Sequence, residues 1–443
     1  MPIISIGRIN KSLLYITLMS TFMVLNQYIY GFVYIECFYP MNIYKSLYNA
    51  IINKNKTDFP HHRVFDPLFS YLGVIFLSLF IPKETNKNKD KNRTKSQLSL
   101  RLIHTEMGNY LESKKGIIFF IFVLILWIAE ENLLLIYVDI FQDLDFWFFE
   151  LIFISIIFSK NFSFKIYSHQ ILGMAISIGV GSILKVYNIS LSIISNIKVE
   201  DKKFYQKYPW LCFFALFYFL LILARSYVNT QLKILMDLKF VSHRILLMSY
   251  GSIGLIMCLL IGIFTSFVPC FDFINNYVCK IDYKNKMYFD HFFNYTESLK
   301  NIGVRLIIIV LGMITFFFNK FFYSLIIKRY TPIHVIFSFP IQFFIEKTFL
   351  LIFTSIFFIN QLFEKKNQLE KFLLDESGDI ASILGFLIYL EIIELNFCRF
   401  NYNIKKNIIC RGESEYQISI KKDDTFKEER HSSCDSGDIE IET

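Results

Sequence analysis

The sequence lacks the short motifs through which enzymes bind phosphates, metals or acyl groups. It has no glycine-rich phosphate loop, no histidine pair at metal-binding spacing and no Gly-x-Ser-x-Gly turn. The cysteines other than Cys270 and Cys279, which are considered below as a disulfide, show no spacing typical of metal ligands. We therefore predict that the chain is not an enzyme, and that it uses no metal and no cofactor.

Charged residues are also scarce, at 19% of the chain against 54% hydrophobic residues. The apolar residues fall into blocks of about 17–27, the length with which an α-helix crosses a bilayer. These blocks lack the polar face, repeating at helical period, that a soluble helix needs. The pattern predicts an all-α polytopic membrane protein. The net charge of +8 resides mostly in the loops that flank the blocks, so we expect no nucleic-acid partner.

Ten apolar blocks define the predicted transmembrane helices. The first is long for a signal peptide, and no small-residue cleavage site follows it, so we interpret it as an uncleaved first span. The ten spans are expected at about 13–35, 65–81, 116–139, 146–159, 166–186, 209–228, 244–269, 302–327, 333–359 and 379–398.

The distribution of Lys and Arg predicts the orientation of the chain in the membrane. With both termini in the cytosol, the cytosolic segments hold more basic residues than the opposite side, especially in the loop 82–115. We expect residues 403–443, which are hydrophilic and of mixed charge, to form a disordered cytosolic tail. This topology fits an endomembrane compartment (Golgi, ER or vacuole) and the plasma membrane equally well.

The same topology places the loop 270–300 on the lumenal or extracellular side. This loop carries Cys270 and Cys279, for which we predict a disulfide, and a glycosylation sequon at Asn294. A second sequon, at Asn55, lies in the first loop on that side. A third, at Asn92, falls on the cytosolic side, where it should stay unmodified.

Ten spans divide into two halves of five. Because each half has an odd number of spans, the two halves cross the membrane in opposite directions. We therefore predict two inverted repeats, residues 1–198 and 199–402, as in many secondary transporters. The sequence His169-Gln170-Ile171-Leu172-Gly173 opens span five, and Ala381-Ser382-Ile383-Leu384-Gly385 opens span ten at the equivalent place.

Two stretches of the chain resemble the drug/metabolite transporter superfamily, which includes nucleotide-sugar, triose-phosphate and chloroquine-resistance-transporter-like carriers. They are Phe149–Gly181, with its Gln170-Ile171-Leu172-Gly173 motif, and Asn319–Ile333, where Thr-Pro enters span nine. The resemblance implies ten helices around a central cavity, with spans five and ten available for a homodimer. Phosphate-carrying branches place a Lys where Gln342 stands here, which argues against a phosphorylated or nucleotide-sugar substrate.

Several ionisable residues lie inside the predicted spans, where they are costly and typical of function. The pairs Glu130-Glu131, Asn319-Lys320 and Glu346-Lys347 are well inside their spans. A buried Lys needs a carboxylate partner, which Glu150, Glu346 or a glutamate of span three can supply. The pairs can bind a proton and an anionic or zwitterionic solute, or they can lock helices together as structural ion pairs. The residues expected to contact substrate are Glu130, Glu131, Glu150, Asn319, Lys320, Gln342 and Glu346.

Arg225 stands at the expected end of span six, where we interpret it as reaching out to the membrane interface. Our leading hypothesis is a secondary carrier of a small polar solute, working by alternating access and coupled to protons through Glu130 or Glu131. One alternative is a non-transporting scaffold or receptor that binds partners through the loop 82–115 and the tail. Another is a membrane-embedded enzyme, which requires His, Asp or Ser clustered at one membrane interface.

Overall fold

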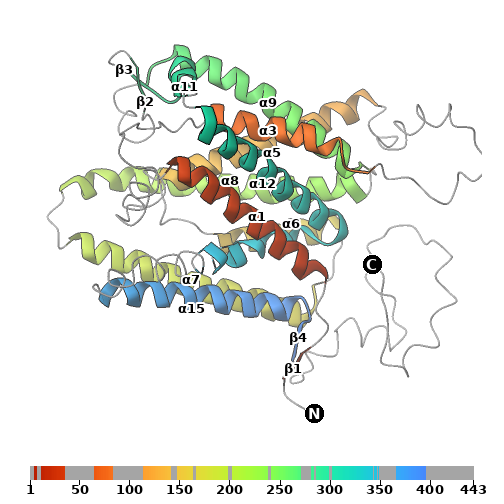
Figure 1. Ribbon diagram of the computed structural model, residues 1–443. Helices are drawn as coiled ribbons and strands as arrows, with labels where there is room; N and C mark the ends of the chain where they lie inside the picture. Colours follow the sequence, from red (N-terminus) through yellow and green to blue (C-terminus); the bar gives the residue numbers. More distant parts are fainter. Residues whose placement is uncertain are drawn as a thin grey trace, which may run out of the picture. The chain divides into compact units, whose positions relative to one another are not determined.

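The computed structural model describes the helices and short strands of the chain but not every connection between them (Figure 1). Helices hold 86% of the residues described, so the predicted all-α class is confirmed. The described residues are 4–6, 11–34, 64–82, 113–140, 147–162, 166–197, 202–237, 241–270, 281–283, 286–298, 302–342, 344–346, 348 and 366–395. The predicted cytosolic tail and most of the loop 82–115 lie outside these ranges.

The helices overlap all ten predicted spans. They are α1 (Lys11–Tyr34), α3 (Phe65–Ser78), α5 (Lys114–Ile140), α6 (Trp147–Phe162), α7 (Ser168–Ile197), α8 (Lys202–Asp237), α9 (His243–Phe267), α11 (Phe292–Ser298), α12 (Ile302–Arg329), α13 (Pro332–Ile336) and α15 (Lys366–Tyr389). The strands β1 (Ile4–Ile6) and β4 (Ile393–Leu395) pair antiparallel, as do β2 (Ile281–Tyr283) and β3 (Lys286–Tyr288).

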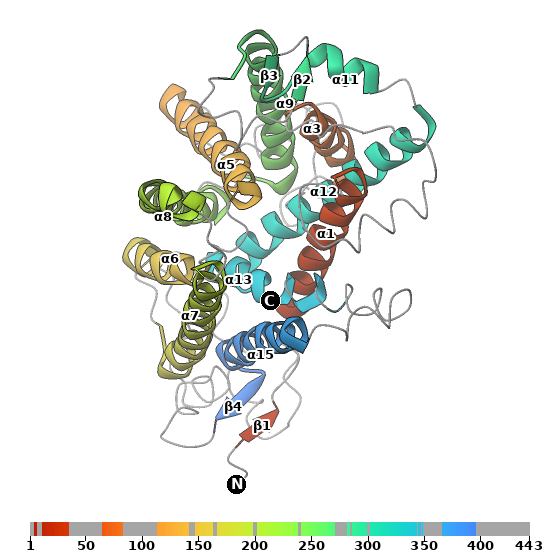
Figure 2. The ribbon, with the colours of Figure 1, turned by 90° about the vertical axis from the view of Figure 1, so that its left-hand side faces the viewer.

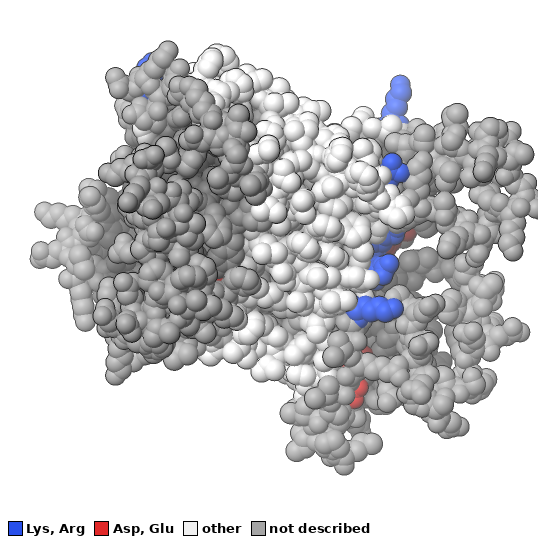
Figure 3. Space-filling model, viewed as in Figure 1, with Lys and Arg blue, Asp and Glu red and all other residues white. Residues whose placement is uncertain are grey.

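Among the described residues, three helical segments are long and apolar enough to cross a bilayer. They are Lys114–Leu133 in α5, His243–Phe267 in α9 and Ile309–Arg329 in α12. Large apolar side chains such as Leu260 of α9 remain exposed, which suits contact with lipid rather than water. On the face drawn in Figure 3, the described part of the surface is almost free of charge except at its edge. These features support a membrane protein, while the ten-span inverted repeat stays a prediction.

The described chain forms two compact units. Unit 1 comprises residues 1–17, 146–214 and 326–443, and unit 2 comprises residues 18–145 and 215–325. Each unit therefore takes segments from both of the predicted sequence halves, 1–198 and 199–402. The compact units do not coincide with the sequence halves, because helices from the two halves pack on each other within each unit.

In unit 1, α7 and α15 pack closely side by side, as Figure 2 also shows. Glycine makes this contact close, because a Cβ built on Gly385 would lie 2.5 Å from the carbonyl oxygen of Gly173. The hydroxyl of Ser177 donates a hydrogen bond of 2.9 Å to the backbone carbonyl of Ser382. Small residues thus allow two helix backbones to meet, as helices do in lipid. The face of α7 around Gly173 is covered within the chain, and the homodimer stays a prediction.

The end of α15 corrects the predicted span ten. The helix stops at Tyr389 rather than near residue 398, and Glu391 turns the chain with a positive φ of 62°. Strand β4 follows and pairs with β1 near the N-terminus. The apolar run continues past Tyr389. The helix nevertheless ends there, because β4 and β1 satisfy each other's backbone groups by pairing. The Glu391 carboxylate lies 3.0 Å from Nε2 of the buried His169, an ion pair whenever the imidazole is protonated.

In unit 2, glycines of α9 lie against side chains of α3. Side chains added at Gly251, Gly254 and Gly262 would collide with Ile75, Tyr71 and Phe65 of α3, respectively. The three glycines lie on one face of α9 because their spacings of three and eight residues match the helical period. This face brings the aromatic ring of Tyr71 directly against the backbone of α9, next to the site described below.

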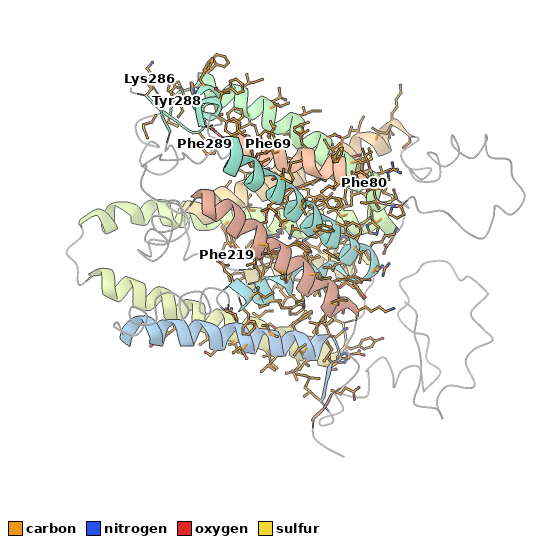
Figure 4. All side chains as sticks on the ribbon, in the orientation of Figure 1. Phe69, Phe80, Phe219, Lys286, Tyr288 and Phe289 are labelled. Atoms are coloured by element: carbon orange, nitrogen blue, oxygen red, sulfur yellow. The ribbon has the colours of Figure 1, made fainter. Side chains whose placement is uncertain are left out.

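A buried aspartate closes the N-terminal end of α3. The Asp290 carboxylate accepts hydrogen bonds from the backbone amides of Val64 at 2.8 Å and Phe65 at 3.3 Å. The ring of Tyr295, in α11, stacks on Phe65 with 5.2 Å between centroids. The described part of the connection from α9 to α12 is therefore packed onto the start of α3. Figure 4 labels Lys286, Tyr288 and Phe289 in this connection.

Candidate functional site

An ion pair joins two membrane helices inside unit 2. The Lys320 ammonium of α12 bonds directly to the Glu131 carboxylate of α5. Their side chains are only 8% and 14% exposed, respectively. Of the carboxylates expected to pair with a buried lysine, the structure therefore selects a glutamate of span three. Both residues lie within segments apolar enough to cross a bilayer.

Two further donors hold the Glu131 carboxylate. The indole Nε1 of Trp127 donates to Oε1 at 2.8 Å, and the hydroxyl of Tyr250 donates to Oε2 at 2.5 Å. Trp127 precedes Glu131 by four residues, one helical turn, which places the two side chains on the same face of α5. Together with Lys320, these donors satisfy a charge that would otherwise be costly in an apolar interior.

Four aromatic rings surround the Lys320 ammonium. Its Nζ lies 5.7 Å from the ring centroid of Trp127, 5.5 Å from Tyr250, 5.1 Å from Phe316 and 5.8 Å from Tyr323. All four distances are within the range of a cation–π interaction. We call these four rings the aromatic cage. Three helices contribute to it, namely α5, α9 and α12.

The sequence holds a signal for this cage that our sequence analysis missed. Phe316 precedes Lys320 by four residues and Tyr323 follows it by three. Both spacings place a ring on the lysine's own face of α12. Aromatic residues are so frequent in this chain that the spacing alone did not stand out. The rings of Trp127 and Tyr250 come from other helices, and only the fold brings them in.

Hydrogen bonds extend the site in two directions. Towards α3, the hydroxyl of Tyr71 accepts a hydrogen bond of 3.1 Å from Asn132, and its ring lies 5.5 Å from that of Tyr250. Towards α8, the hydroxyl of Tyr323 donates to Oδ1 of the fully buried Asn229. The ion pair is thus one part of a buried polar network that reaches five helices of unit 2, namely α3, α5, α8, α9 and α12.

The α8 helix carries a buried polar face and corrects our interpretation of Arg225. The helix continues to Asp237, about 18 Å beyond Arg225, so this residue is not at the helix end. Its side chain is 9% exposed and does not reach out to solvent. Lys233, two turns further on, pairs with Asp237 at 2.7 Å. The apolar block ended at about residue 228, but tertiary packing buried the polar continuation.

The other predicted site residues are divided between the two units. Asn319 is buried and donates a hydrogen bond of 3.3 Å to the carbonyl oxygen of Met19 in α1. Glu130 is 2% exposed and points about 100° around α5 from Glu131. Glu150, Gln342 and Glu346 all belong to unit 1, where the first two are buried and Glu346 is half-buried. The described contacts therefore bring Glu131 and Lys320 together. A glutamate of span three was among the predicted partners of a buried lysine.

The predicted modification sites lie at the edge of what the structure describes. Cys270 is described, and its backbone amide donates to the carbonyl of Met287 at 2.9 Å, but Cys279 and Asn55 lie outside the described residues. The disulfide therefore stays a prediction. Asn294 lies within α11, and its glycosylation also stays a prediction. Within the described ranges, no group of three or more His, Cys, Asp or Glu residues could hold a metal ion.

Comparison with known proteins does not place the chain in a family. No protein-family model matches it, and no curated protein is significantly similar to it. The resemblance to drug/metabolite transporters accordingly depends on the two stretches of sequence that suggested it.

Proposed function

We propose that this protein is a secondary carrier that moves a small polar solute across an endomembrane or the plasma membrane by alternating access. The observation that carries the proposal is the ion pair between Glu131 and Lys320, enclosed between helices apolar enough to span a bilayer. A purely structural contact at this place could be made by apolar side chains, which often stabilise a buried site as well as an ion pair does. Ionisable residues retained inside a membrane region are typical of substrate and proton pathways.

The pair gives the carrier a way to couple solute movement to protons. When a proton neutralises Glu131, the Lys320 ammonium loses its counter-charge in an apolar interior. The attraction between α5 and α12 weakens, and the hydrogen bonds from Trp127 and Tyr250 weaken with it. A conformation that exposes the site to water then becomes more favourable, because water can solvate the released ammonium.

Alternating access in our proposal depends on the inverted repeat, and helix packing within each unit supports it. Predicted spans five and ten, α7 and α15, pack together in unit 1; spans two and seven, α3 and α9, do so in unit 2. Spans four and nine also meet, through α6 and α13. Such pairing of equivalent spans is expected when a two-fold axis in the membrane plane relates the two halves. The resemblance to drug/metabolite transporters agrees with this arrangement and is part of the proposal.

Transport by the reconstituted protein tests the proposal. Proteoliposomes would be loaded with a library of small polar solutes, and uptake would be followed under an imposed pH gradient. We expect Glu131→Gln to abolish the dependence on the gradient and Lys320→Met to reduce uptake strongly. Asp237→Asn, which breaks the ion pair with Lys233 on α8, is the matched control and should keep the coupling.

The alternative hypothesis, a non-transporting scaffold or receptor, predicts a different result in the same vesicles. The wild-type protein would then move no solute in the library, although it is correctly folded and inserted. If transport occurs but its coupling is identical in wild type, Glu131→Gln and Lys320→Met, the role of the pair in our proposal is wrong.

A further inference from the structure

The aromatic cage identifies the sign of the charge that this site accepts. An aromatic ring has a negative face, so four rings around one point attract a cation and repel an anion. Glu131 adds a full negative charge at the same point. The rings also support each other, since Trp127 lies 4.2 Å from Tyr250 and stacks on Tyr323 at 5.1 Å between centroids. The site is thus a preformed receptor for an ammonium group.

An anionic solute would meet unfavourable surroundings here. To reach the Lys320 ammonium it would have to compete with the carboxylate of Glu131 and approach the negative faces of the rings. This geometry argues against our expectation, from the sequence, that Lys320 binds an anionic or zwitterionic solute. A solute that carries an ammonium group finds favourable partners on every side once Lys320 withdraws.

We propose that the aromatic cage and Glu131 form the binding site for an organic ammonium ion, and that Lys320 is a tethered occupant that this ion displaces. This inference deepens the proposed function, since it names the substrate class of the carrier. The four-carbon stem of lysine is flexible enough for its ammonium to leave while the helix stays in place. Substrate and lysine would then alternate on Glu131, so that the carboxylate is never left without a counter-charge.

Binding of tetramethylammonium to the purified full-length protein tests this proposal without relying on transport. Affinity would be measured by calorimetry, and the thermal unfolding midpoint would serve as a second readout. Lys320→Met removes the competing ammonium but keeps a side chain of similar length, and should increase the affinity by about tenfold or more. Adding Glu131→Gln to that variant should abolish binding, and adding Phe316→Leu should weaken it several-fold.

Controls separate the charge from other causes. In the Lys320→Met variant, tert-butanol, a neutral molecule of similar shape, and acetate, an anion, should produce no shift of the unfolding midpoint. Lys233→Met replaces another buried, ion-paired lysine of unit 2 and should keep the wild-type affinity for tetramethylammonium.

Two results would overturn the inference. One is a monodisperse, helical Lys320→Met protein that does not respond to tetramethylammonium. The other is a wild-type protein that acetate stabilises and tetramethylammonium does not. If solute transport nevertheless depends on Glu131, the carrier function stands and only the substrate class is wrong. If tetramethylammonium binds as expected but no ammonium compound is transported, the cage is a cation site and the carrier proposal fails.

Discussion

Gly173 of α7 and Gly385 of α15 make reciprocal contacts. A Cβ on either residue would collide with the carbonyl oxygen of the other, and each would also approach a backbone amide four residues beyond its partner, Tyr389 or Ser177. Such reciprocity is what a local two-fold axis between two helices would produce. The two glycines are also the residues that the sequence placed at equivalent positions of spans five and ten. Substitution of Gly173 therefore tests the packing of α7 on α15 directly.

Gly173→Ala should destabilise the protein by about 1–3 kcal/mol, because the added methyl group has to push the backbone of α15 away. The measurement is the free energy of unfolding in detergent micelles. Gly179→Ala is the matched control on the same helix, since a Cβ there meets nothing within 4 Å. The control should be neutral or slightly stabilising, because alanine favours a helix more than glycine does. Equal effects of the two changes would contradict the close packing of α7 on α15.

Removing one charge of the ion pair should lower the stability of the protein more than removing both charges. Lys320→Met leaves the Glu131 charge in an apolar interior, and we expect a loss of about 3 kcal/mol of stability. The double variant Glu131→Gln/Lys320→Met removes both charges and should recover most of that loss. A double-mutant cycle of unfolding free energies measures the difference. Strictly additive effects would show that the two residues do not interact.

The cap on α3 predicts a local effect of Asp290→Ala. The substitution leaves the amides of Val64 and Phe65 without their acceptor and should cost about 1–2 kcal/mol of stability. Hydrogen exchange should accelerate at the start of α3 more than at its end. Lys286→Ala, at an exposed position of β3 in the same connection, is the control and should leave both quantities unchanged. Uniform acceleration along α3 would argue against a capping role.

Glycosylation tests the predicted topology. In a eukaryotic host, we expect a glycan on Asn294, removed by a glycosidase that cleaves N-linked glycans and absent in Asn294→Gln. The sequon at Asn92 is the internal control, because the predicted orientation places it in the cytosol. Asn92→Gln should therefore leave the electrophoretic mobility unchanged. A glycan on Asn92 together with none on Asn294 would show that the orientation of the chain is opposite to the predicted one.

The sequence by itself determined the helical class and the positions of most helices. An apolar run such as 244–269 has to satisfy its backbone groups internally in lipid, so its length alone predicts the helix His243–Phe267. The same logic failed at both ends of α8 and at the end of α15, where the helix boundaries do not follow the apolar runs. The sequence also indicated that Lys320 needs a carboxylate partner, but it left several candidates open.

Only the tertiary structure decided which of these residues meet. It chose Glu131 as the partner of Lys320, buried Arg225 in the middle of a helix, and gathered rings from three helices around one ammonium. The physical reason is that apolar periodicity fixes the length of a helix in a membrane but hardly its rotation, because lipid accepts any apolar face. Close contacts at glycines and the pairing of buried charges set the rotation, and these interactions exist only between helices that have already packed.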